Sequence, residues 1–317
     1  MRVVLTSDAS HDECMTLHEY AAFVPDAYRP MVEPTRTWWQ WRDTRVHIAR
    51  AHRPESGARV LVIHGAGGYS EALWPAAAIV ASDGVEVIAP DLPLYGYTET
   101  PDPAGVRYAD WIDLLCDLVR AETAADARPL ILLGASMGGM LAYEVAARTG
   151  IVAAVLATCL LDPSDPAARA AATRYAWMGG PAPILLRTID PVVGRLRVPV
   201  RWMADMAAMS ANPALSRLCA TDPRGGGARV PLGFFASFMN YAHTPPETFD
   251  AAPVTLVQPA ADRWTPPEVS LPFLHRISSR TKVVMLENCG HFPIEEPGIG
   301  QLREEVLATV SEVAPAQ

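Results

Sequence analysis

The segment "GASMGG", residues 134–139, places Ser136 between glycines two positions before and two positions after it. An apolar run precedes this G-x-S-x-G pattern and a helix-like pattern follows it, which is typical of a sharp strand-to-helix turn that exposes a serine hydroxyl. The neighbours must be small because such a turn brings backbone segments close together. Ser136 is therefore a candidate nucleophile, and the N–H of Met137, at the start of the helix, is a candidate donor to an oxyanion.

A serine hydroxyl needs a general base and a group that orients the base. His291 follows the last strand-like run, in "NCGHFPIEEPG", and Asp262 follows the preceding run, in "PAADRWTPPE". The chain order Ser136, Asp262, His291 is the order nucleophile, acid, base that this turn predicts. Alternatives stay open: His291 as a solvated loop histidine, Asp262 as a helix cap or a partner of Arg263, and Asp162 as a reserve acid.

A second oxyanion donor is expected in the loop after the first parallel strand, "HGAGGYS". The N–H of Ala66 is the candidate, and Gly67 allows the backbone to approach a substrate closely. We expect His64 to brace this loop by hydrogen bonds. Asp91, in "DLPLYGYTE", is interpreted as structural.

These residues require a sheet that brings the ends of several strands together. Six short apolar runs alternate with helix-length segments, which predicts strands buried on both faces in a parallel sheet. The runs are "ARVLVIHG", "GVEVIAP", "PLILLG", "AAVLATCLL", "PVTLVQP" and "KVVMLEN". The expected helices are Glu71–Ser82, Tyr108–Thr123, Met137–Arg148 and Gly300–Val313. The fold class is α/β, with a mostly parallel, doubly wound sheet.

The chain divides into three parts. Residues 1–36 form an N-terminal extension, residues 37–161 and 253–317 form the α/β core, and residues 162–252 form a helical insertion. The core opens with "TWWQWR" and "RVHIARAH", which predict two antiparallel edge strands joined by a tight turn. Within the insertion we expect short helices and no strand; the helical segments are "ARAAATRYAWM", "RWMADMAAM" and "PLGFFASFMNYA".

Composition excludes several classes of protein. The formal charge is −9 and no Lys/Arg-rich block occurs, which disfavours nucleic acid as a partner. No apolar run approaches the ~20 residues of a membrane span, so no integral membrane association is expected. Five scattered cysteines argue against a disulfide framework and favour the cytoplasm. His11, Cys14 and His18 have helical spacing but no fourth ligand, so we expect no metal.

Five motifs then occur in order: "HGAGG", "DLPLYGYT", "GASMGG", "AADRWTP" and "GHFPIEEP". Together they resemble the α/β-hydrolase fold family, in its serine esterase or lipase-like branch, over residues 37–161 and 253–313. The resemblance implies a lid formed by residues 162–252, an acyl-enzyme mechanism and no cofactor. Serine at position 136 disfavours the dehalogenases and epoxide hydrolases of this fold, which use aspartate. Pro93 and Tyr95 depart from the second motif of many relatives.

The expected function is hydrolysis of carboxylic esters with small to medium apolar acyl groups. Aromatic and methionine residues of the insertion suit such a pocket. The candidate substrate-binding residues are Gly67, Trp177, Trp202, Met206, Phe235, Phe238 and Trp264. A C–C bond hydrolase, lactonase, thioesterase or cofactor-free perhydrolase is the alternative, as is a non-catalytic ligand-binding homologue. The expected partner is a small-molecule ester, and a homodimer stays open.

Overall fold

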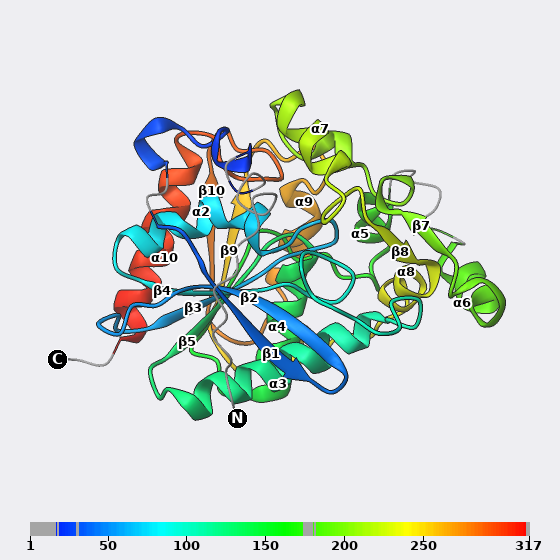
Figure 1. The fold of residues 1–317 in the computed structure, drawn as a ribbon, viewed down its shortest axis with the longest axis horizontal. Coiled ribbons are helices and arrows are strands. Elements are labelled where there is room, and N and C mark those ends of the chain that lie inside the picture. The colour runs from blue at the N-terminus through cyan, green and yellow to red at the C-terminus, as the bar shows by residue number, and fades with distance from the viewer. Residues whose placement is uncertain (1–16, 18, 30–31, 174–179, 181, 315–317) are drawn as a thin grey trace.

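A computed structural model describes residues 17, 19–29, 32–173, 180 and 182–314. Its centre is an eight-stranded sheet with the order β1-β2-β4-β3-β5-β6-β9-β10 (Figure 1). The strands are β1 (Thr35–Trp41), β2 (Thr44–Ala51), β3 (Arg59–Ile63), β4 (Glu86–Pro90), β5 (Leu130–Gly134), β6 (Ala154–Ala157), β9 (Val254–Pro259) and β10 (Thr281–Leu286). β1 and β2 form the expected antiparallel pair, β2 also pairs antiparallel with β4, and the other neighbours are parallel. The predicted doubly wound sheet is confirmed.

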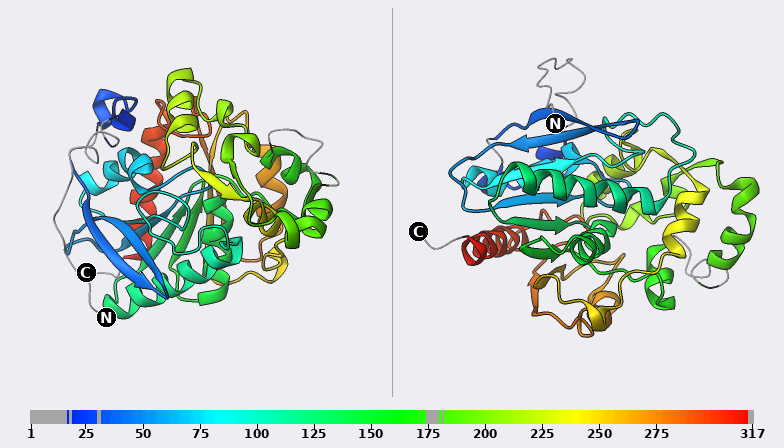
Figure 2. Two further views of the ribbon diagram at one scale, coloured as in Figure 1. Left: turned by 45° about the vertical axis from the view of Figure 1, so that its right-hand side comes forward. Right: turned by 90° about the horizontal axis from the view of Figure 1, so that it is seen from below.

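Helices cover both faces of the sheet, as the view from below in Figure 2 shows. The core helices are α2 (Ser70–Ser82), α3 (Tyr108–Ala125), α4 (Met137–Thr149), α9 (Pro267–Leu274) and α10 (Gly298–Val313). Alternate residues of β3 point to opposite faces: Val60 and Val62 belong to the cluster with α2 and α10, whereas Leu61 and Ile63 belong to the cluster with α3 and α4. The continuous apolar runs are therefore explained by two buried faces.

Strand β10 is the exception to this rule. Most of its residues are not buried, and Val283 and Met285 are 39% and 38% exposed. The expectation that this run is buried on both faces is wrong, because β10 lies at the edge of the sheet and pairs only with β9. The apolar sequence predicted the strand correctly but not its burial.

The insertion, residues 162–252, lies between the parallel neighbours β6 and β9. Its helices are α5 (Pro166–Ala172), α6 (Ala182–Val193), α7 (Pro213–Thr221) and α8 (Leu232–Met239), with short 3-10 turns η3 (Val200–Trp202), η4 (Met206–Ala208) and η5 (Pro246–Thr248). The expectation of no strand is wrong, because β7 (Arg197–Pro199) pairs antiparallel with β8 (Arg229–Pro231). Strands of three residues are too short to show an alternating pattern. "RWMADMAAM" forms 3-10 turns rather than a helix.

The N-terminal segment is packed against the fold where it is described. Tyr20 and Val24 are each 2% exposed and belong to the main core cluster, followed by the 3-10 turn η1 (Asp26–Tyr28). His11, Cys14 and His18, whose spacing was weighed for metal binding, lie outside the described residues.

In the part of the chain that the structure describes, no cluster of three metal-ligating side chains occurs, and no helix has the length and apolar character to cross a bilayer. The four cysteines in this part, which are Cys116, Cys159, Cys219 and Cys289, are free and buried.

Candidate active site

Ser136 occupies the turn between β5 and α4 in a strained backbone conformation, with φ 55° and ψ −127°. The two flanking positions must be glycine because nearby backbone carbonyl groups leave no room for a side chain. A methyl group on Gly134 would lie 2.1 Å from the carbonyl oxygen of Gly138, and one on Gly138 would lie 2.2 Å from the carbonyl oxygen of Ile63. The turn is thus possible only without side chains at these positions, and it presents the Ser136 hydroxyl beyond the end of the strand.

His291 and Asp262 meet this hydroxyl from the loops after β10 and β9. The His291 Nε2 lies 2.8 Å from the Ser136 Oγ, and the His291 Nδ1 lies 2.8 Å from the Asp262 Oδ2. Because an ionised carboxylate only accepts hydrogen bonds, the imidazole proton belongs on Nδ1 and Nε2 is left to accept from the serine. The structure therefore brings together the three residues that the sequence selected, in a geometry suited to proton transfer.

Asp262 is held in place from both of its oxygens. Its Oδ1 accepts hydrogen bonds from the backbone N–H groups of Trp264 and Thr265, and its Oδ2 accepts from the Thr265 hydroxyl at 2.7 Å. Burial disfavours the charged carboxyl, but His291 and the Thr265 donors outweigh it and hold the pKa of Asp262 below its ordinary value. Asp262 thus caps the local turn and also faces the imidazole.

The reserve acid Asp162 lies elsewhere. Its carboxylate accepts hydrogen bonds from the backbone N–H and the hydroxyl of Ser164, at 2.9 and 2.6 Å. This arrangement is a local turn before α5, and His291 takes Asp262 as its partner instead.

The loop after β3 packs directly on the Ser136 turn. A methyl group on Gly65 would lie 2.9 Å from the backbone nitrogen of Met137, so this loop is in close contact with the start of α4. Ala66 follows in the same loop, which places both candidate oxyanion donors on adjoining segments. Gly67 has φ +81°, a left-handed conformation that favours glycine.

His64 and Asp91 hold this loop in place through hydrogen bonds. The His64 Nδ1 lies 2.8 Å from the Gly65 carbonyl oxygen, and its Nε2 accepts from the N–H of Leu92 at 2.9 Å. Burial lowers the pKa of His64, in keeping with a neutral ring that donates at one nitrogen and accepts at the other. Asp91 is fully buried and accepts from the N–H of Ser70 at 2.6 Å. The structural interpretation of both residues is confirmed.

The candidate substrate-binding residues separate into groups. The Trp264 ring lies 4.6 Å from the His291 ring, and the Met206 methyl group would lie 3.3 Å from a methyl on Gly67. Phe235 and Phe238 are buried in the main core cluster, and Trp202 is 57% exposed. Trp177 lies outside the described residues. Gly67, Met206 and Trp264 are therefore the candidates next to the reactive groups.

Two threonines that support the site were not selected from the sequence. The Thr158 hydroxyl, at the end of β6, accepts a hydrogen bond from the backbone N–H of Ser136 at 2.9 Å. The Thr265 hydroxyl lies 3.2 Å from the His291 Nδ1 as well as bonding Asp262. The available signal for Thr158 was a threonine hydroxyl inside the otherwise apolar run "AAVLATCLL".

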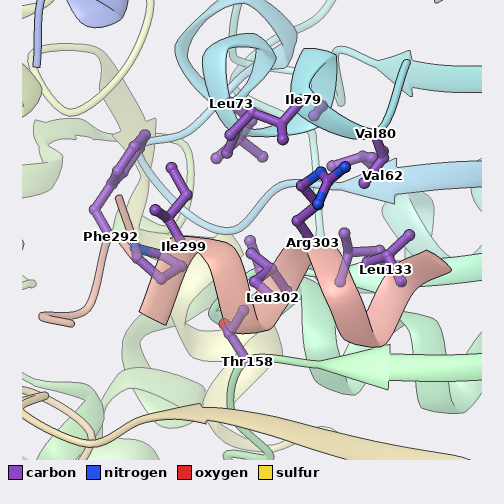
Figure 3. Close-up of a pocket in the computed structure, with 15 residues that line it drawn as sticks. Val62, Leu73, Ile79, Val80, Leu133, Thr158, Phe292, Ile299, Leu302 and Arg303 are labelled. Carbon is purple, nitrogen blue, oxygen red and sulfur yellow. The ribbon is translucent and has the colours of Figure 1, made fainter. Parts of the chain in front are cut away.

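An apolar pocket lies below the Ser136 turn, between α2 and α10 (Figure 3). Leu73 and Ile79 line it from α2, Leu302 from α10, and Phe292 from the loop that carries His291. Its volume is about 50 Å³, well below the roughly 150 Å³ of a cavity that holds benzene. Ser136, His291 and Asp262 do not line this pocket, and we do not assign it to the substrate.

The sheet, the serine turn and the histidine–aspartate pair define a hydrolase-type α/β protein. The profile of the alpha/beta hydrolase family matches residues 60–299. The chain therefore belongs to the alpha/beta hydrolase family.

Solved structures have the same fold. A monoglyceride lipase from Saccharomyces cerevisiae, solved with a substrate analogue, is similar with a TM-score of 0.74 and 16% identity, covering 92% of this chain and 100% of that one. A monoacylglycerol lipase from Paleococcus ferrophilus has a TM-score of 0.65 and 21% identity, covering 84% and 98%. An esterase from M. tuberculosis has a TM-score of 0.61 and 18% identity, covering 96% and 100%. A comparison with curated protein sequences gave no significant match.

Proposed function

We propose that this protein is a serine hydrolase that cleaves carboxylic esters through an acyl-enzyme intermediate. The observation that carries the proposal is the continuous hydrogen-bonded series from the Ser136 Oγ through His291 to Asp262, with 2.8 Å at each step. Family membership supports a hydrolase, and the fold is shared with two lipases and an esterase.

In the proposed reaction, the Ser136 Oγ attacks the ester carbonyl while His291 accepts its proton at Nε2. Asp262 holds the imidazole orientation and stabilises the imidazolium. The N–H groups of Ala66 and Met137 stabilise the tetrahedral oxyanion, and the loss of one such donor costs about 3–4 kcal/mol in known cases. His291 then returns the proton to the leaving alcohol, and a water activated by the same residue hydrolyses the acyl-enzyme.

The insertion acts as a lid in this proposal. Met206 reaches the oxyanion loop and Trp264 covers one side of His291, so both present apolar surface next to the reacting carbonyl. These residues, together with Gly67, favour small to medium apolar acyl groups. No charged side chain is assigned to acyl recognition.

The test combines labelling with turnover. A fluorophosphonate probe should label the wild type and leave Ser136→Ala unlabelled, and p-nitrophenyl esters of two to eight acyl carbons should be hydrolysed by the wild type alone. Parallel assays with lactones and thioesters separate the alternative chemistries. Labelling of Ser136→Ala, or ligand binding without any turnover by the wild type, would contradict the proposal.

A further inference from the structure

Asp222 is a buried carboxylate that the proposed reaction does not use. It lies at the end of α7 in the insertion and is 5% exposed. Its Oδ2 accepts a hydrogen bond from the Tyr20 hydroxyl at 3.0 Å and another from the Tyr69 hydroxyl at 2.8 Å. One carboxylate oxygen therefore joins three segments that are distant in sequence: the N-terminal segment, the loop after β3 and the insertion.

The Tyr69 bond reaches the loop of the proposed oxyanion donor. Tyr69 is fully buried and lies three residues after Ala66, immediately before α2. Its hydroxyl fixes the far end of this loop, whose near end is fixed by the His64 bond to Gly65. The loop is thus tied at one end to the sheet edge and at the other to the insertion.

The backbone after Asp222 also packs closely against this loop. Asp222 organises the turn, since its Oδ1 accepts from the N–H of Arg224 and its carbonyl oxygen accepts from the N–H of Gly227. A methyl group on Gly225 would lie 2.8 Å from the carbonyl oxygen of Gly67. Gly225 is therefore explained by close backbone approach to the loop after β3, whereas methyl groups on Gly226 and Gly227 would lie 2.4 Å from the carbonyl oxygen of Cys219 and 2.7 Å from that of Thr221.

The Tyr20 bond reaches the other half of the site. The Tyr20 ring stacks on the Phe292 ring, with 6.3 Å between centroids and 19° between planes. Phe292 follows His291, and its backbone N–H donates to the carbonyl oxygen of Met209 in the insertion at 2.7 Å. The N-terminal segment consequently supports the loop that carries the imidazole.

We propose that Asp222 is a positioning residue for the active site, holding the Ala66 loop through Tyr69 and the His291 loop through Tyr20. This inference rests on the proposed function for its effect on catalysis. Oxyanion donors and the general base accelerate the reaction only when their geometry is fixed in advance. The N-terminal segment then has a role, because its Tyr20 hydroxyl donates one of the two tyrosine hydrogen bonds to the Asp222 Oδ2.

The experiment uses Asp222→Asn, Tyr69→Phe and Tyr20→Phe in the full chain, with p-nitrophenyl butyrate as the substrate. The rate is expressed per active site titrated with the fluorophosphonate, so unfolded molecules do not count. We expect kcat to fall tenfold or more in Asp222→Asn and Tyr69→Phe, and to fall in Tyr20→Phe as well, with KM within threefold of wild type in all three. Tyr143→Phe is the control because the Tyr143 side chain is buried and its hydroxyl donates a part-buried hydrogen bond, to the Thr244 carbonyl oxygen at 2.9 Å. Its kcat per site should stay within twofold of wild type.

Hydrogen–deuterium exchange of residues 64–73 provides a readout that does not depend on catalysis. Exchange should be faster in Asp222→Asn and Tyr69→Phe than in wild type and Tyr143→Phe. Wild-type kcat per site together with wild-type exchange in these variants would overturn the inference.

If the wild type neither reacts with the probe nor turns over esters, the proposed function fails, while the exchange data still decide whether Asp222 positions the loop. If Asp222→Asn does not fold, Tyr69→Phe decides the test, because it removes one hydrogen bond to Asp222 and leaves the carboxylate in place.

Discussion

Replacing Asp262 by asparagine should remove most of the activity without removing the side chain's shape. The Asp262 Oδ1 accepts from two backbone N–H groups, so the amide oxygen of asparagine will take that position. The amide NH₂ then faces the His291 Nδ1, where the carboxylate oxygen lay at 2.8 Å. Two donors cannot face each other, so His291 has to move its proton from Nδ1 to Nε2.

The size of the effect follows from this change of tautomer. An imidazole protonated at Nε2 cannot accept the proton of Ser136, and the equivalent substitution in a known serine protease lowers kcat by about 10⁴. Such a loss corresponds to about 5.5 kcal/mol in the activation free energy. We expect the same order of magnitude here, with a thermal unfolding temperature within a few degrees of wild type.

The assay is kcat for p-nitrophenyl butyrate at neutral pH, with protein concentration from absorbance and folding checked by circular dichroism. Asp162→Asn is the matched control, because that carboxylate accepts hydrogen bonds from the neighbouring Ser164 and not from His291, so kcat should stay within twofold of wild type. A folded Asp262→Asn enzyme with more than a tenth of the wild-type rate would refute the reasoning. So would a large loss in Asp162→Asn, which would move the acid to the other loop.

Three further results are expected. Thr158→Val removes the acceptor of the nucleophile's backbone N–H and should lower the free energy of unfolding by about 1–3 kcal/mol in urea titrations. Gly134→Ala forces a methyl group to 2.1 Å from a facing carbonyl oxygen, so purified protein should show no fluorophosphonate labelling; normal labelling would contradict the steric account. Burial lowers the pKa of His243 from 6.5 to about 4, so the unfolded chain binds the extra proton between these values and stability should fall by about 3 kcal/mol as pH drops from 6.5 to 4. That slope should disappear in His243→Asn and persist in the exposed-site control His275→Gln.

The serine turn and the sheet could be predicted because their constraints leave a regular signal in the sequence. Gly134 is required by the backbone of Gly138 in the same turn and Gly138 by the carbonyl oxygen of Ile63 in β3, and both glycines stand at a fixed spacing from Ser136. Strands such as β3 and β5 are buried along their whole length, which leaves a continuous apolar run. The loops after parallel strands share one edge of the sheet, and this rule was enough to select Asp262 and His291.

The contacts that support the site could not be predicted, since they leave no periodic signal. Tyr20 and Asp222 are 202 positions apart, and nothing in either neighbourhood specifies the other. β7 and β8 have three residues each, and pairing over so short a length is decided by tertiary packing. The apolar residues Tyr20–Val24 were a local hint that this segment packs on the core, but they do not indicate which carboxylate the Tyr20 hydroxyl meets.

The division between these two kinds of contact has a functional consequence. Ser136, Asp262 and His291 lie in loops at one edge of the sheet, and the insertion contacts the His291 loop through the hydrogen bond from the Phe292 N–H to the Met209 carbonyl oxygen. The insertion also meets the Ala66 loop, at Gly67 and Tyr69. A change in the insertion can therefore alter substrate fit and oxyanion geometry together. Substitutions around Asp222 should accordingly change kcat for all esters in parallel, whereas substitutions at Met206 should change the preference among acyl chain lengths.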